Sequence, residues 1–198
     1  MVYLKQFIDA IAFLSEFEPE HSISDAKRNE IYKYFKNKSS DLELQKAISE
    51  AIDQTVPEFI KNLPYPAAHQ CNALSHSFHR IWKNSPLNDV SFTAITIGTV
   101  EYRGKKIYDV DKISIKKMIK DGPKIEQQLN AHVWLTLSDL TVLDLTISPT
   151  LVDRGYVKSG TLPDYIIWRE DRASDFRYTP ILQHNNFIDA VDIIRGIL

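Results

Sequence analysis

The hydrophobic period changes along this chain, and the change limits the folds that it can adopt. Up to about residue 82, apolar residues recur three and four positions apart, as on one face of an α-helix. From about residue 90, apolar and β-branched residues alternate with polar ones, as in half-buried strands. Helices followed by strands predict an α+β fold with an antiparallel sheet.

The first third of the chain is predicted to be helical. Apolar stripes and cap candidates predict helices over 4–17, around 31–35 after Ser22 or Ser24, over 44–52, and a short one restarting at the capping box Thr55–Glu58. The prolines at 64 and 66 then predict a stiff connector, because each fixes its own φ and disfavours a helical predecessor. We therefore expect an N-terminal helical region over 1–63 and an α+β core over 64–198.

The rest of the chain combines strands with three helices. Strands are expected over 90–97, 99–110 with a hairpin at Gly104, 131–137, 141–147, 164–168 and 178–183, and helices over 71–82, 113–119 and 187–198. The helix that begins at Cys71 buries one side, and the thiol lies on that side near the helix start. A helix start carries partial positive charge, which stabilises a thiolate.

The strands over 131–137 and 141–147 are predicted to form a hairpin whose register can be derived from burial. If the apolar positions of both strands share one face, Leu137 pairs with Thr141. His132 and Asp144 then become diagonal neighbours on the opposite face, with Cβ atoms about 7 Å apart or closer. This separation allows a carboxylate–imidazole hydrogen bond.

Cys71 is the only cysteine of the chain, so no internal disulfide can form. A buried lone cysteine is often inert, but a thiol, a histidine and a carboxylate in this order are what thiol nucleophiles require. Three other histidines are closer to Cys71 in sequence. On an ideal helix His76 and His79 point away from the thiol, and His69, which precedes the helix, is a rival base. The same angular spread argues against a metal site formed with Cys71.

Three short motifs resemble the core of the transglutaminase-like proteins, which belong to the broader papain-like cysteine fold. They are Gln70-Cys71 at a helix start, His132-x-Trp134 on a strand and Asp144-x-Thr146 on the next strand. The resemblance covers roughly residues 66–146. It implies Cys71 as nucleophile, His132 as base and later acid, and Asp144 as the carboxylate that orients the histidine. It also implies acyl transfer, peptide hydrolysis or deamidation, and the family includes inactive members.

The oxyanion and substrate-binding groups depart from the family pattern. Asn72 follows the cysteine where animal transglutaminases carry tryptophan, and no tryptophan precedes Cys71. The backbone N–H of Cys71 and the Gln70 side chain are therefore the candidate oxyanion donors. Gln70 and Trp134 are the expected substrate-binding residues.

Composition limits the partners. The net charge of −2 gives no reason to expect nucleic acid or an anionic membrane, and no apolar stretch is long enough for a signal or a membrane span. The glycines lack a phosphate-binding spacing, and no serine lies in a nucleophile elbow. We expect a cytoplasmic protein that acts without a metal or cofactor on a peptide, protein or small amide.

Two further functions stay open from the sequence. An inactive transglutaminase-like fold would act as a protein-binding module, with the helices of 1–63 as the interaction surface. The segment 103–124, with eight Lys or Arg and three Asp, could instead bind an acidic partner, although such runs are usually solvated helix faces.

Overall fold

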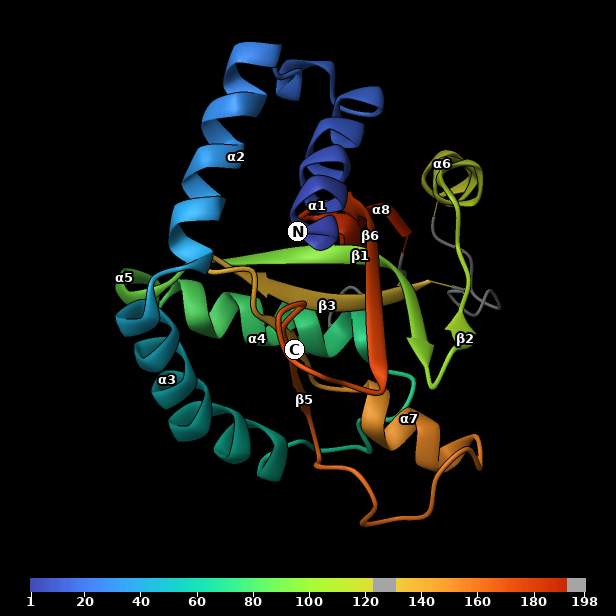
Figure 1. Cartoon of the computed structure of the whole chain (residues 1–198). Coiled ribbons are helices and arrows are strands. Elements are labelled where there is room, and N and C mark those ends of the chain that lie inside the picture. The colour runs from blue at the N-terminus through green and yellow to red at the C-terminus, as the bar shows by residue number, and fades with distance from the viewer. Residues whose placement is uncertain (123–130, 192–198) are drawn as a thin grey trace.

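An antiparallel sheet with helices against both of its faces forms the fold (Figure 1). The computed structural model of the chain describes residues 1–122 and 131–191. Helices and antiparallel strands together make this an α+β fold, as the change of hydrophobic period predicts. Within the described residues, none of the helices combines the length and apolar character that crossing a membrane requires.

The sheet has the order β2-β1-β3-β4-β5, and β6 pairs with β1. All strand pairs are antiparallel. The strands are β1 (Thr93–Tyr102), β2 (Lys105–Tyr108), β3 (His132–Leu137), β4 (Val142–Asp144), β5 (Ile166–Trp168) and β6 (Phe176–Gln183). Arg103 and Gly104, both with positive φ, form the two-residue turn between β1 and β2, which confirms the hairpin predicted there.

The helices precede, interrupt and follow the strands. They are α1 (Val2–Phe13), α2 (Asp25–Ser39), α3 (Leu42–Lys61), α4 (Cys71–Lys83), α5 (Leu87–Val90), α6 (Lys112–Asp121), α7 (Ile147–Asp153) and α8 (Phe187–Val191), with 3₁₀ turns at Leu14–Glu16 and Pro19–His21. The Ser24 side chain accepts a hydrogen bond from the Lys27 N–H, which confirms one of the two cap candidates.

The two faces of the sheet have separate apolar cores. Val133 and Leu135 belong to the core that includes α4, whereas Trp134 belongs to the core that includes α1. Figure 1 shows α1 and α4 on opposite sides of the sheet. The alternation predicted for β3 is therefore confirmed, because successive side chains of a strand point to opposite faces.

The sheet curls until its outer strands β5 and β6 contact each other. The Trp168 indole N–H of β5 donates to the Phe176 carbonyl of β6 at 2.9 Å, and the Trp168 ring lies 5.4 Å from the Tyr178 ring. At Gly98, strand β1 lies so close to β6 that a Cβ would be only 2.1 Å from the Thr179 carbonyl oxygen, so only glycine fits there. Side chains of β6 can therefore reach β4 on the concave face.

Three details of the expected elements are wrong. The helix does not restart at Thr55, because α3 runs through Pro57 to Lys61 and the Thr55 hydroxyl donates within the helix, to the Ala51 carbonyl at 2.6 Å. The strand expected from Val90 begins only at Thr93, because Leu87–Val90 form the short helix α5 after Pro86, whose fixed φ suits a helix start. The strand expected over 141–147 ends at Asp144, and α7 begins at Ile147.

The division into a helical region over 1–63 and a core over 64–198 stays a prediction. Helix α1 packs mainly against β6, which comes from the far end of the chain. The Glu170 carboxylate accepts hydrogen bonds from the N–H groups of Val2 and Tyr3 and so caps the start of α1. The part of the last expected helix beyond residue 191 lies outside the described residues.

Candidate active site

The Cys71 side chain lies where the start of α4 meets the start of β3. Cys71 is the first residue of α4 and is 5% exposed, on the buried side of the helix as predicted. Its Sγ is 3.9 Å from the carbonyl oxygen of Ala131, the residue before His132. The Gln70 side chain at the N-cap makes no cap hydrogen bond, and the partial positive charge of a helix start lies beside the thiol.

The β3–β4 hairpin has the register derived from burial. Leu135 pairs with Leu143, and the Leu137 N–H donates to the Thr141 carbonyl at 2.9 Å. His132 and Asp144 therefore lie diagonally on one face, and His132 Nε2 is 2.6 Å from Asp144 Oδ2. Both side chains are fully buried. The predicted carboxylate–imidazole contact is confirmed.

Electrostatics favour a charged His132–Asp144 pair. Burial alone lowers the pKa of His132, but the Asp144 charge and hydrogen bond, together with Cys71, raise it to about 10. Burial alone raises the pKa of Asp144, but His132 and the N–H groups of Thr146 and Ile147 hold it below its ordinary value. The pair is therefore an imidazolium and a carboxylate at neutral pH.

The second nitrogen of His132 distinguishes this imidazole from a purely structural one. Nδ1 is buried and has no hydrogen-bond partner among the described residues. Nε2 is hydrogen-bonded to Asp144, and the Cys71 side chain is close enough to contribute to the raised pKa of His132. One nitrogen is thus held, and the other can exchange a proton with the sulfur or with a substrate.

Two tyrosines complete the site, and the sequence did not indicate either of them. The Tyr178 hydroxyl donates to Asp144 Oδ2 at 3.0 Å, and the Tyr108 ring stacks on the His132 ring at a centroid distance of 4.7 Å. Alternation along β6 places Tyr178 on a buried face. The curl of the sheet brings Tyr178 to Asp144. The sequence pattern could therefore predict that Tyr178 is buried, but not that it contacts Asp144.

The two residues expected to bind substrate differ in their placement. Gln70 is half-buried at the position before α4, next to the thiol, and its role stays a prediction. Trp134 is fully buried, and its indole N–H already donates to the Tyr3 hydroxyl at 3.0 Å. The expected substrate contact of Trp134 is therefore not supported, because its ring fills the core beneath α1.

The other histidines near Cys71 in sequence have partners elsewhere. His76 Nε2 accepts from the Ile188 N–H at 3.2 Å, and His79 Nδ1 is 2.7 Å from Thr93 Oγ1. His69 Nε2 is 2.9 Å from Asp153 Oδ2. Burial and then His79 lower the pKa of His76 to about 4, so His76 is neutral at neutral pH. Among these four histidines, His132 is the one that is bonded to a buried carboxylate and lies close enough to Cys71 for the thiol to affect its pKa.

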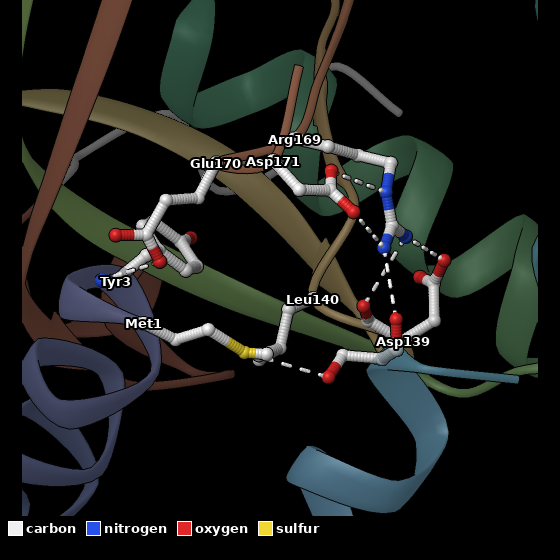
Figure 2. A pocket seen from close by; sticks show the side chains of 8 residues that line it. Met1, Tyr3, Asp139, Leu140, Arg169, Glu170 and Asp171 are labelled. Carbon is white, nitrogen blue, oxygen red and sulfur yellow. Dashed lines mark hydrogen bonds and ion pairs between the residues drawn. The ribbon is translucent and has the colours of Figure 1, made fainter.

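A second buried ion pair occurs at the other end of the same hairpin. Asp139, in the turn between β3 and β4, is fully buried, and its Oδ2 is 2.5 Å from Arg169 Nη1. Arg169 also donates to Asp171, to Thr141 and to the Ser39 carbonyl. Figure 2 shows Arg169, Asp139 and Asp171 around a small pocket, with Tyr3 and Glu170 on its other side.

Part of the basic segment 103–124 forms ion pairs. Within the segment 103–124, Arg103 pairs with Asp175 and Lys106 with Asp109. Its binding of an acidic partner stays a prediction, and Lys124 lies outside the described residues. Glu18, Glu20 and His21 are close enough to share a metal ion, but they are not part of the thiol site.

The sequence matches no protein-family model and no curated protein, and the structure matches no solved structure.

Proposed function

We propose that the protein is a cysteine-dependent hydrolase or acyltransferase that acts on an amide or ester bond. The observation that carries this proposal is a buried His132–Asp144 ion pair beside a thiol at a helix start. We also propose the transglutaminase-like version of the papain-like fold. A thiol-bearing helix packed on a sheet, with histidine and aspartate on adjacent antiparallel strands, is what that resemblance implies.

The reaction that these residues support has two halves. The Cys71 thiolate attacks the carbonyl carbon, the C–S bond forms, and the tetrahedral intermediate collapses with cleavage of the C–N or C–O bond. The His132 imidazolium gives its proton to the departing amine or alcohol. His132, now neutral, takes a proton from water or an acceptor amine, which attacks the thioester and releases the acyl group from Cys71.

Asp144 orients and charges the imidazole in both halves. Its contact with Nε2 leaves Nδ1 as the nitrogen that exchanges protons, and its negative charge stabilises the imidazolium. The Tyr178 hydroxyl and the N–H groups of Thr146 and Ile147 hold the carboxylate in place. The carboxylate therefore has little freedom to turn away from His132.

Acyl-enzyme formation with p-nitrophenyl acetate tests the proposal. Because Cys71 is the only cysteine, intact-mass measurement reports acetylation of one thiol without ambiguity. We expect a burst of p-nitrophenolate and one acetyl group per chain, and we expect neither from Cys71→Ala. His21→Ala, which removes an exposed histidine outside the thiol site, is the control and should retain the burst. Equal p-nitrophenolate release from the wild type and Cys71→Ala would contradict the proposal.

A catalytically inactive fold that serves as a protein-binding module is the second candidate. The low exposure of Cys71 and the contact of its sulfur with the Ala131 carbonyl favour this alternative. Under it, Cys71 is a core residue and the N-terminal helices are the interaction surface. No acetyl-enzyme would form, and Cys71→Ala would leave partner binding unchanged.

A further inference from the structure

Helix α7 is joined to the segment that leads into the nucleophile. The Thr150 side chain, in the middle of α7, is fully buried. Its Oγ1 accepts a hydrogen bond from the His69 N–H at 3.0 Å. His69 lies two residues before Cys71, so this contact fixes the backbone just before the start of α4.

His69 is held in an unfavourable conformation at that point. Its φ is +62°, in the left-handed region that residues other than glycine seldom adopt. Its imidazole also pairs with Asp153, at the end of α7, at 2.9 Å. Strained backbone persists only where its surroundings determine it, and here both the backbone and the side chain of His69 are tied to α7.

Thr150 also interacts with the residue that stacks on the base. Burial raises the pKa of Tyr108, and the Thr150 side chain is close enough to oppose this shift. The Tyr108 ring stacks on the His132 ring at 4.7 Å. The Arg154 guanidinium, just after α7, lies 4.5 Å from the Tyr108 ring centroid and donates to the Ile107 carbonyl. The ring is thus fixed by α7 as well as by β2.

We infer that Thr150 is a positioning residue of the thiol site, because its hydroxyl holds the backbone before Cys71 and its side chain lies beside the ring packed on His132. This inference rests on the proposed function and adds the group that sets the distance between sulfur and imidazole. A displacement of about 1 Å at reacting groups can lower a rate by about 100-fold. The register of α4 against β3 therefore depends on a residue that does not touch substrate.

The rate of Cys71 alkylation by iodoacetamide, measured against pH, tests this role in the full chain. Thr150→Val keeps the side-chain shape and removes the hydroxyl. We expect alkylation about 3- to 10-fold slower at pH 6, the range that loss of one hydrogen bond gives, with the pH midpoint moved upward. Thr150→Ser restores the hydroxyl and should come within about 2-fold of the wild type. Thr55→Val, the same change inside α3, is the matched control and should leave the rate unchanged.

The variants separate failure of this inference from failure of the proposed function. If His132→Gln slows alkylation but Thr150→Val does not, the positioning role is wrong and the proposed function stands. If His132→Gln leaves the rate and midpoint unchanged, the proposed function is wrong and the positioning role falls with it. If Thr150→Val does not fold, Thr150→Ala removes the same acceptor of the His69 N–H with a smaller side chain. It should slow alkylation about 3- to 10-fold, and an unchanged rate would overturn the inference.

Discussion

Two buried carboxylates at opposite ends of strand β4 have different surroundings. Asp139 pairs with Arg169, and Asp144 pairs with His132. Each carboxylate is fully buried and also accepts backbone N–H groups, from Thr141 at Asp139 and from Thr146 and Ile147 at Asp144. The acidic halves of the two pairs are therefore alike, and the difference lies in the cations.

Every nitrogen of the Arg169 guanidinium has a partner, whereas one nitrogen of His132 has none among the described residues. A buried polar atom without a hydrogen bond lowers stability, so native proteins seldom keep one without another use for it. All guanidinium nitrogens of the Asp139–Arg169 cluster are paired, as expected for a pair that stabilises the fold. The Asp144–His132 cluster instead keeps one nitrogen available beside a thiol.

The largest expected effect belongs to the fully paired cluster. Arg169→Ala leaves Asp139 charged and buried without its cation, so we expect the free energy of unfolding to fall by about 3–5 kcal/mol. Urea denaturation measures this change. Arg28→Ala, which removes a surface ion pair with Asp9, should cost at most about 1 kcal/mol. A loss from Arg169→Ala as small as that of Arg28→Ala would break the comparison.

The second largest effect is expected on the rate of Cys71 alkylation when His132 is replaced. His132→Gln removes the imidazolium beside Cys71, so we expect iodoacetamide to alkylate the thiol about 100-fold more slowly at pH 6, equivalent to about 2.7 kcal/mol. His79→Gln, which changes a buried histidine of α4 that is bonded to Thr93, is the control and should alkylate like the wild type. Similar rates for both variants would mean that His132 does not act on the thiol.

The His132–Asp144 pair should make the stability of the fold depend on pH. The pKa of His132 rises from 6.5 in the unfolded chain to about 10 in the fold, so the folded state holds an extra proton between these values. Its stabilisation is complete below pH 6.5 and is lost as the pH rises to about 10, at up to about 1.4 kcal/mol per pH unit. Thermal or urea unfolding across this window should show the slope in the wild type, and His132→Gln should flatten it. An equal slope in both proteins would assign the effect to other groups.

The smallest effect concerns the tyrosine that holds Asp144. Tyr178→Phe removes one hydrogen bond to the carboxylate, so we expect a loss of about 1 kcal/mol in the free energy of unfolding. Alkylation at pH 6 should slow severalfold, because Asp144 then orients His132 less firmly. Tyr102→Phe removes a buried hydroxyl that has no partner in the described part of the chain, so it should leave the alkylation rate unchanged and should not lower the free energy of unfolding. A Tyr178→Phe variant that matches Tyr102→Phe would remove Tyr178 from the site.

Local periodicity was sufficient to predict the face and register of the His132–Asp144 hairpin. The period of two determines which side chains share a face, and burial of the apolar set together with the short loop selects the pairing of Leu137 with Thr141. The same kind of argument predicted that Cys71 lies on the buried side of α4. These predictions depend on residues close together in the chain.

The surroundings of the site depended on contacts between distant segments. Tyr178 reaches Asp144 because the sheet curls, and Tyr108 reaches His132 because β2 turns back beside β1, neither of which alternation determines. The side chain of Asp144 binds the N–H groups that follow it and ends the strand there, so α7 with Thr150 replaced the expected strand end. Trp134 belongs to one of the motifs that resemble the transglutaminase-like proteins, but helix α1 packs over its side chain and buries it.

The pH profile of Cys71 alkylation in the wild type, Asp144→Asn and Asp139→Asn tests the central claim most directly. If Asp144 charges the base of a thiol nucleophile, the wild type and Asp139→Asn react with iodoacetamide at a midpoint well below that of a free cysteine, and Asp144→Asn moves toward the free value. One profile shared by all three proteins and by a free cysteine would contradict the account.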